Sequence, residues 1–262
     1  MLAAQRQELI LERLRRDGSV RVTDLVTSLA VSDMTIRRDL DTLEGRGALR
    51  KVHGGAVASE GPRTEEPGFQ AKSTRQAAEK QAIARAVAGL VEPNSAVGLS
   101  AGTTTALVAE YLRDTPGLTV ITNSLPVAEV FHRSERSDQT VALTDGFRTP
   151  SDALVGPLAL ASVHGINLDT LVLGVHGMHE RAGFTTPNLM ESETNRALVE
   201  SAETLVVAAD SSKWGTVGIS TITPLNRCDV LVTDDGLATD ARHTLQDHVG
   251  SLVVTDVPRE TG

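Results

Sequence analysis

The stretch Ser32-Asp-Met-Thr-Ile-Arg-Arg38 combines hydroxyl and guanidinium groups at the start of an expected helix. An arginine there can form a bidentate pair with guanine O6 and N7 in the major groove, or bind a phosphate. Serine and threonine hydroxyls, with backbone N–H groups, can hold phosphate oxygens. The stretch predicts contact with double-stranded DNA through these side chains: Ser32, Asp33, Met34, Thr35, Arg37 and Arg38.

A second stretch, Ser100-Ala-Gly-Thr-Thr-Thr105, has the composition of an anion-binding turn. Glycine lets the backbone approach a ligand, and threonine hydroxyls with the N–H groups at a helix start can bind a phosphate. The stretch is not a P-loop, because no Gly-Lys-Ser/Thr follows, and the chain has no Gly-x-Gly-x-x-Gly. On this motif alone, an ordinary glycine turn with a threonine cap explains the stretch equally well.

The elements that must position the first stretch lie in residues 1–58. Apolar spacing predicts amphipathic helices over residues 4–16 and 23–29 and from Ser32 to about residue 44. Residues 49–57 read as a small hairpin around His53-Gly54-Gly55. Two short helices joined by a tight turn and followed by a hairpin predict a winged helix-turn-helix, with Ile36 on the buried side of the third helix.

Residues 59–70 have the composition of a linker, and residues 71–262 follow a different pattern. Short apolar runs alternate with helical stretches, which predicts a doubly wound, mostly parallel α/β domain. The expected strands are 96–99, 118–121, 140–143, 171–174, 205–208, 230–232 and 252–254, and the expected helices are 74–91, 104–113, 125–133, 153–163, 190–202 and 240–248. Ligands in such sheets bind at the carboxyl ends of the strands.

The net charge of the 262-residue chain also changes sign near residue 58. The formal net charge is −9, but residues 1–58 carry ten Lys/Arg and eight Asp/Glu, net +2, so the remaining residues carry net −11. The single Cys228 excludes a disulfide framework, and no apolar run or leader pattern predicts a membrane span or export. These features predict a cytoplasmic globular protein whose two parts have different partners.

The residues from 5 to 57 resemble the DNA-binding region of DeoR-type bacterial transcription regulators. The resemblance rests on Arg6-x3-Ile10-x3-Leu14, on the stretch from Ser32 to Leu40, and on a wing-like ending, Arg50-Lys-Val-His53-Gly-Gly-Ala56. The hairpin residues Arg50, Lys51 and His53 are expected to follow the DNA backbone beside the groove. The net charge of +2 is modest, so two or more copies, a homo-oligomer, are expected on one operator. The resemblance implies a repressor of carbohydrate-metabolism genes as the family default.

The residues from about 69 to 238 resemble the effector domain of the same family, which is similar in fold to ribose-5-phosphate isomerase and binds phosphorylated sugars or related metabolites. The resemblance rests on Lys80-x2-Ile-Ala84, Gly102-Thr-Thr-Thr105, Thr119-Val-Ile-Thr-Asn123-Ser124, Gly156 and Asp210-Ser-Ser-Lys213-Trp214. It implies that the turn holds a phosphate and that no cofactor is needed. The implied effector-binding residues are Ser100, Gly102, Thr103, Thr104, Thr105, Asn123, Ser124, Gly146 and Lys213.

Two positions depart from the family pattern. The family often has an acidic residue just before the turn, where this chain has Ser100-Ala101, and often has Gly-Gly where this chain has Asp145-Gly146. Both positions would face the sugar rather than the phosphate, so an unusual effector is expected. Lys213 is implied to reach the phosphate or a sugar hydroxyl; without the family context, a solvated loop lysine is equally plausible.

Two enzyme interpretations compete with a regulator. Gly98-x-Ser100-x-Gly102 matches a hydrolase nucleophile elbow, with His53-Gly-Gly, Asp229 and His243 as possible partners. We disfavour it because the elbow would lie on the first strand of its domain and the wing explains His53. A sugar-phosphate isomerase needs a carboxylate base, and Gly174-Val-His-Gly177 supplies none.

A metal site is also disfavoured. His176, His179 and Glu180 lack a further ligand at suitable spacing, so solvated loop histidines explain them better.

Overall fold

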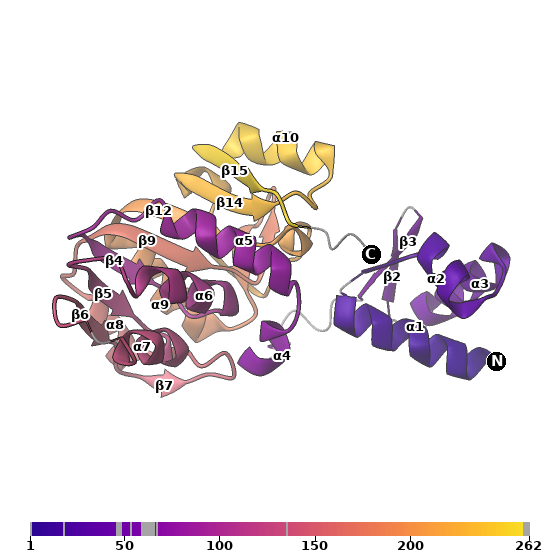
Figure 1. Ribbon diagram of the computed structural model, residues 1–262, viewed down its shortest axis with the longest axis horizontal. Coiled ribbons are helices and arrows are strands. Elements are labelled where there is room, and N and C mark those ends of the chain that lie inside the picture. The colour runs from indigo at the N-terminus through magenta and orange to yellow at the C-terminus, as the bar shows by residue number, and fades with distance from the viewer. Residues whose placement is uncertain are drawn as a thin grey trace. The chain divides into compact units, whose positions relative to one another are not determined.

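The computed structural model describes residues 2–17, 19–45, 49–52, 54–58, 66, 68–134 and 136–258, without the side chains of residues 4, 15–17, 50 and 58. The chain divides into two compact units, Met1–Pro62 and Arg63–Gly262 (Figure 1). We describe each unit by itself.

The described residues of the first unit form three helices and a three-stranded antiparallel sheet. The helices are α1 (Ala3–Asp17), α2 (Val22–Leu29) and α3 (Asp33–Gly45); the strands, in the order β1-β3-β2, are β1 (Ser19–Arg21), β3 (Gly55–Ala58) and β2 (Leu49–Val52). Buried aliphatic side chains from all three helices meet in one core: Ile10, Leu14, Leu25, Ile36, Leu40 and Leu43. This is the expected winged helix-turn-helix. The hairpin gains β1 as a third strand, which the sequence presented only as a short connecting stretch.

Gly54 and Gly55 have separate structural roles in the wing. Gly54 adopts a φ of +79°, a conformation that side chains disfavour, at the turn between β2 and β3. A Cβ on Gly55 would lie 2.1 Å from the carbonyl oxygen of Val20 in β1. The pair of glycines therefore allows β3 to pack directly against β1, and the wing accounts for it without an oxyanion hole.

The second unit is built on seven parallel strands in the order β15-β14-β12-β9-β4-β5-β6. All seven expected runs fall in this sheet, which confirms the doubly wound fold. The strands are β4 (Ala96–Leu99), β5 (Thr119–Thr122), β6 (Thr140–Leu143), β9 (Leu168–Gly174), β12 (Ala202–Ala208), β14 (Val230–Asp234) and β15 (Ser251–Thr255).

Helices cover both faces of this sheet because its strands are apolar on both sides. On one face, α5 (Ala77–Ala88), α6 (Thr103–Leu112) and α7 (Leu125–His132) pack over Val172 and Val206. On the other face, α8 (Pro157–Val163), α9 (Leu189–Glu200) and α10 (Thr239–His248) pack over Leu171 and Leu205. Helices α5 and α6 lie side by side over the sheet (Figure 1).

Several short elements surround the carboxyl ends of the strands. They are α4 (Phe69–Ser73), the pair β7 (Phe147–Arg148) and β8 (Leu154–Val155), the antiparallel sheet of β10 (Gly177–His179), β11 (Gly183–Thr186) and β13 (Ser220–Thr223), and the 3-10 helix η1 (Ser211–Lys213). The 3-10 helix η2 (Leu225–Arg227) instead precedes β14, at the amino end of that strand. The sequence did not predict them, because each is too short for a periodic pattern. The helix expected over 153–163 is wrong at its start, where β8 lies and α8 begins only at Pro157. Helix α4 begins at Phe69, within the stretch expected to be linker.

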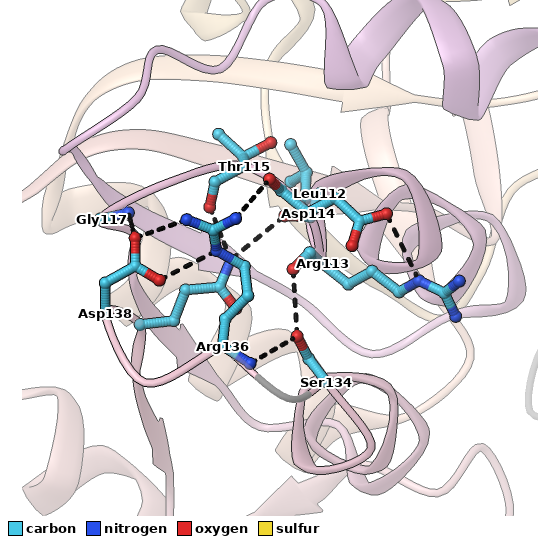
Figure 2. A network of polar contacts seen from close by, with 9 residues as sticks. Leu112, Arg113, Asp114, Thr115, Gly117, Ser134, Arg136 and Asp138 are labelled. Atoms are coloured by element: carbon cyan, nitrogen blue, oxygen red, sulfur yellow. Dashed lines mark hydrogen bonds and ion pairs between the residues drawn. The ribbon is translucent and has the colours of Figure 1, made fainter.

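A polar network holds together the loops at the amino ends of β5 and β6 (Figure 2). The Arg136 guanidinium donates to both oxygens of Asp138, at 2.9 and 2.6 Å, and to the carbonyl of Asp114 at 3.3 Å. Asp138 also accepts from the N–H of Gly117 at 3.1 Å. Because these segments precede β5 and β6, the network stabilises the amino ends of the strands and leaves the carboxyl ends to other residues.

Among the described residues, no helix is long and apolar enough to cross a membrane.

Candidate functional site

Helix α3 begins with the expected cap at Ser32. The Ser32 hydroxyl lies 2.8 Å from the Thr35 hydroxyl and accepts from the Thr35 N–H at 3.3 Å, while the Ser32 carbonyl accepts from the N–H of Ile36. Both hydroxyls thus take part in capping the start of the helix. A phosphate at this end would meet the remaining N–H groups of the first turn and the positive end of the helix dipole.

The solvent face of α3 presents the predicted base-contacting side chains. Met34 is 75% exposed, and Arg37 forms an i, i+4 ion pair with Asp33 at 2.5 Å, in which both side chains are 56% exposed. Arg38 is exposed, and its guanidinium has no side-chain partner in the part of the chain that the structure describes. An exposed pair such as Arg37–Asp33 contributes little, so Arg37 can exchange Asp33 for DNA at small cost.

The wing places one predicted residue beside α3. The Lys51 ammonium forms an ion pair with Asp41, and the Lys51 N–H donates to the Glu44 carboxylate at 2.8 Å. Lys51 therefore fixes the wing against α3 and lies next to the predicted DNA face. His53 and the side chain of Arg50 lie outside the described residues.

A buried ion pair holds α3 in place. Arg6 of α1 pairs with Asp39 of α3, and the Gln7 amide donates to the other Asp39 oxygen at 3.1 Å. Asp39 is only 4% exposed, so removing Arg6 would leave a buried, uncompensated carboxylate. The pair fixes the angle between α1 and the recognition helix.

In the second unit, the strand order reverses between β4 and β9, which lie side by side in the centre of the sheet. The loops that follow these strands meet there: the Ser100 hydroxyl accepts from the Gly174 N–H at 2.9 Å. Such a reversal opens a crevice at the carboxyl ends of the strands. The predicted anion turn lies at this position.

The turn leads into α6. Gly102 precedes the helix, and the Thr105 hydroxyl donates back to the Gly102 carbonyl at 3.0 Å. The first intrahelical bond runs from the Ala106 N–H to the Gly102 carbonyl, so the N–H groups of residues 103–105 have no partner within the helix. These groups can bind an anion, as the sequence predicts.

Three predicted effector residues are instead occupied in holding the loops. Ser100, Asn123 and Ser124 are each at most 1% exposed. The Asn123 amide accepts from the Ala101 N–H at 3.0 Å and donates to the Leu154 carbonyl at 3.2 Å, and Ser124 caps α7 by accepting from the Val127 N–H at 3.3 Å. These residues shape the crevice, and their polar atoms have partners in the protein.

The burial of Ser100 bears on the hydrolase interpretation. A nucleophile must reach a substrate, and this side chain is 0% exposed and bound to Gly174. The other parts of the motif have structural explanations: a Cβ on Gly98 would lie 2.6 Å from Leu168 Cδ1, and Asp229 accepts from the Leu205 N–H at 2.7 Å. The apparent elbow is therefore a packing feature.

Lys213 belongs to a cluster of cations that the sequence analysis only partly anticipated. Lys80 of α5 is 3% exposed, and its ammonium donates to the Lys72 carbonyl. Burial lowers the pKa of Lys80 to about 8; Asp210 opposes this shift, and Lys213, Lys72 and Arg75 add to it. Lysines that lower one another's pKa can be stabilised by a bound anion.

His176 lies in the loop after β9 and is affected by the positive charges of the same lysines. Burial, and then the charges of Lys213 and Lys72, lower the pKa of His176 to about 4, while Glu66 opposes the shift. A neutral imidazole can donate or accept a hydrogen bond, which suits a ligand hydroxyl. His176 is thus a neutral neighbour of the lysine cluster. No group of three His, Cys, Asp or Glu side chains that could hold a metal occurs in the described part of the chain.

Two glutamates that the sequence analysis missed lie beside this cluster. Glu191, at the start of α9, accepts from the hydroxyls of Thr149 and Thr186 at 2.8 and 3.2 Å. Burial, and then the charge of Glu66, raise the pKa of Glu191 to about 7. The stretch 174–177 supplies no carboxylate, as its sequence shows, whereas Glu66 and Glu191 both act on Lys72.

Gly146 is placed by packing. It adopts a φ of +135°, and a Cβ there would lie 2.5 Å from the Val155 carbonyl oxygen. This close approach in the β7–β8 pair requires glycine whatever the ligand.

The fold and these two surfaces define a class of protein: a helix-turn-helix unit that reads DNA, joined to an α/β unit with a ligand crevice. Residues 6–61 match the family model for the DeoR-like helix-turn-helix domain, and residues 75–235 match that for the DeoR C terminal sensor domain. The chain belongs to the DeoR family of transcriptional regulators, and its relatives are regulators rather than enzymes.

Relatives match this chain over most of its length, as two examples show. The chain is 35% identical over 261 residues to the HTH-type transcriptional regulator GlpR of Haloferax volcanii, covering 99% of this chain and 100% of that protein. It is 32% identical over 235 residues to the lactose phosphotransferase system repressor of Streptococcus mutans, covering 89% and 93%.

Among solved structures, ribose 5-phosphate isomerase A of Methanocaldococcus jannaschii matches 52% of this chain and 53% of that one, with 17% identity and a TM-score of 0.38.

Proposed function

We propose that this regulator represses carbohydrate-metabolism genes and is controlled by a phosphorylated sugar bound in its second unit. The observation that carries the proposal is the packing of α6, whose first N–H groups have no partner within the helix, against α4 and α5, which carry Lys72 and Lys80. A phosphate monoester matches both features, since helix N-termini and ammonium groups stabilise its charge. The name of the S. mutans relative supports the choice of repression and of sugar genes.

The residue assignments follow from this geometry. Thr103, Thr104 and Lys213 would contact the phosphate, with Gly102 and Thr105 shaping the turn, and Lys80 and Lys72 would supply charge. His176 and Gly146 would lie towards the sugar. In the first unit, Arg38 and Arg37 would contact bases, with Met34 beside them, while Lys51 would contact a phosphate.

We assign DNA binding to residues 1–58, effector binding to residues 71–262 and the connection to residues 59–70. The protein would act in the cytoplasm, where its operator is. Two or more copies would bind one operator, since helix-turn-helix proteins read paired half-sites. The edge strand β6 is exposed along its length, and Val141, Leu143 and the nearby Phe147 are apolar, which supports self-association. Sedimentation of the purified protein tests this; a monomer at micromolar concentration would exclude it.

The effector proposal is tested by thermal shift with a panel of sugar phosphates and the matching unphosphorylated sugars. Only phosphorylated compounds should raise the unfolding temperature, and Lys213→Ala or Thr104→Val should abolish the rise. Arg113→Ala, which removes an exposed cation paired with Glu110, serves as the matched control and should respond like wild type. Equal responses to both members of each pair would show that phosphate is not recognised.

A further inference from the structure

Glu66 lies within the stretch that was expected to be a linker. Two side chains from distant parts of the sensor unit bind its carboxylate. The Ser151 hydroxyl donates to one Glu66 oxygen at 2.5 Å, and the Asn188 amide donates to the other at 2.8 Å. These partners follow Glu66 by 85 and 122 residues. One carboxylate near the junction of the two units therefore has a defined receptor.

Both donors are fixed in position by other bonds. Asn188 caps α9, and its carbonyl oxygen accepts from the N–H groups of Met190 and Glu191 at 3.0 and 3.2 Å, which directs its NH₂ group towards Glu66. The Ser151 N–H donates to the Thr149 hydroxyl, and Ser151 is 4% exposed. Held donors bind a carboxylate more tightly than mobile ones, because less side-chain freedom is lost.

Lys72 connects this receptor to the effector crevice. Its ammonium donates to the Ser151 hydroxyl at 2.6 Å, and that hydroxyl in turn donates to Glu66. Its carbonyl accepts from the Lys80 ammonium. Lys213 also acts on Lys72: the pKa of Lys72 is lowered first by burial, and the charge of Lys213 adds to this, while Glu191 and Glu66 oppose it. Lys72 is thus linked to the Glu66 carboxylate through the Ser151 hydroxyl, and it also interacts with Lys80 and Lys213.

We propose that Glu66 is an internal counter-anion that competes with the phosphate of the effector. In the ligand-free protein its carboxylate balances Lys72 and is held to the sensor unit by Ser151 and Asn188. A phosphate dianion among Lys72, Lys80 and Lys213 attracts Lys72 away from Ser151 and repels Glu66. Glu66 is then released from its two donors. This inference rests on the proposed anion site, and for a repressor the form in which Glu66 is held is the one that binds DNA.

Competition makes a prediction that a purely structural contact does not. If Glu66 opposes phosphate, then removing its charge strengthens phosphate binding, whereas loss of a structural contact would leave binding unchanged or weaken it. Coupling between two sites typically changes a binding affinity about 5-fold or more, so we expect Glu66→Gln and Glu66→Ala to bind phosphate at least about 5-fold more tightly than wild type. The matched control is Glu92→Gln, an exposed glutamate of the same unit, which should bind like wild type.

The probe is inorganic phosphate, titrated into the full-length protein by calorimetry. The inference is overturned if wild type binds phosphate, Lys213→Ala loses it, and both Glu66 variants bind no more tightly than Glu92→Gln. Absence of phosphate binding in wild type and in every variant would instead overturn the anion site itself, and the inference with it. The two failures are therefore distinguishable.

A second readout follows release directly. Trypsin cleaves after Arg63, three residues before Glu66. Saturating phosphate should speed this cleavage several-fold in wild type, and Glu66→Ala should show the fast rate without phosphate. Cleavage at an unrelated site, after Arg133 of the same unit, is the internal control. Equal rates at Arg63 with and without phosphate in wild type would contradict release of Glu66.

Discussion

The hydroxyl of Ser100 accepts a hydrogen bond of 2.9 Å from the backbone N–H of Gly174, 74 residues later. This bond joins the loop after β4 to the loop after β9 at the point where the strand order reverses. Gly174 in turn lies against the anion turn, since a Cβ there would be 3.4 Å from Thr105 Cγ2. One buried bond thus sets the width of the crevice between the two loops.

Ser100→Ala should lower the free energy of unfolding by about 1–3 kcal/mol, because it leaves the Gly174 N–H without a partner in the interior. Chemical denaturation measures the change. Thr244→Ala, which removes an exposed hydroxyl that bonds within α10, should cost much less. A change no larger than that of Thr244→Ala would mean that the bond contributes little.

Arg38→Ala and Arg37→Ala should each weaken binding to an operator selected from random DNA. The loss should be about 1–3 kcal/mol where the arginine makes a bidentate hydrogen-bonded contact to a base. Lys51→Ala should weaken all sequences alike and reduce the log–log salt slope by about 0.9 for the lost phosphate contact. Gel shift at several salt concentrations separates these effects. Arg133→Ala, an exposed arginine of the other unit, should leave both quantities unchanged; a double Arg37/Arg38 variant with normal affinity would remove α3 from the interface.

The sequence predicted the elements whose pattern is local. The spacing of Ile36, Leu40 and Leu43 identified the buried side of α3, and the apolar runs identified every strand of the large sheet. The anion turn was also visible, since Gly102 and Thr103–Thr105 are consecutive. Asn123 and Ser124 were predicted to line the pocket from the end of the next strand. Their burial and their bonds within the protein follow from packing that no local pattern encodes.

The cluster behind the turn could not be predicted in the same way. Lys72, Lys80, Glu66 and Glu191 come from segments that only the tertiary fold brings together. One signal was present: Lys80 lies three and four residues before Ile83 and Ala84, on the apolar stripe of α5, where a lysine is unexpected. A charged residue on a buried stripe indicates a partner, and here the partners are the crevice and the Lys72 carbonyl.

Phosphate affinity should fall as the pH rises above 8. Burial lowers the pKa of Lys80 from 10.5 to about 8, and a bound anion favours its charged form, so binding takes up a proton once the free amine is neutral. Between pH 8 and about 9.5 the affinity should drop roughly tenfold, with Lys72 contributing in the same direction. Calorimetry in two buffers of different ionisation enthalpy measures the proton uptake directly.

The Lys80→Met variant separates the contribution of Lys80 from that of its neighbours. It should bind phosphate more weakly and show a shallower pH profile, since Lys72 and Lys213 remain. Arg113→Ala should follow the wild-type profile. An affinity of wild type that is constant up to about pH 9.5 would show that Lys80 stays charged in the free protein, or that it does not sense the anion.

Glu191→Gln should stabilise the protein at pH 8 but not at pH 5. Burial, and then Glu66, raise the pKa of Glu191 from 4.5 to about 7, so the folded protein holds a proton that the unfolded chain releases in between. A raised folded pKa gives stability that is complete below the unfolded value and is lost as the pH rises through the folded one.

The glutamine amide imitates the protonated acid at every pH and can donate to Glu66 as that acid does. The variant should therefore gain about 1–2 kcal/mol over wild type at pH 8, or about 2–4 °C in unfolding temperature for each kcal/mol. Thermal unfolding at pH 5, 6, 7 and 8 measures the difference, with Glu203→Gln, an exposed glutamate of β12, as the control that should show no such trend. Parallel curves for wild type and Glu191→Gln across this range would show that Glu191 does not share a proton with Glu66.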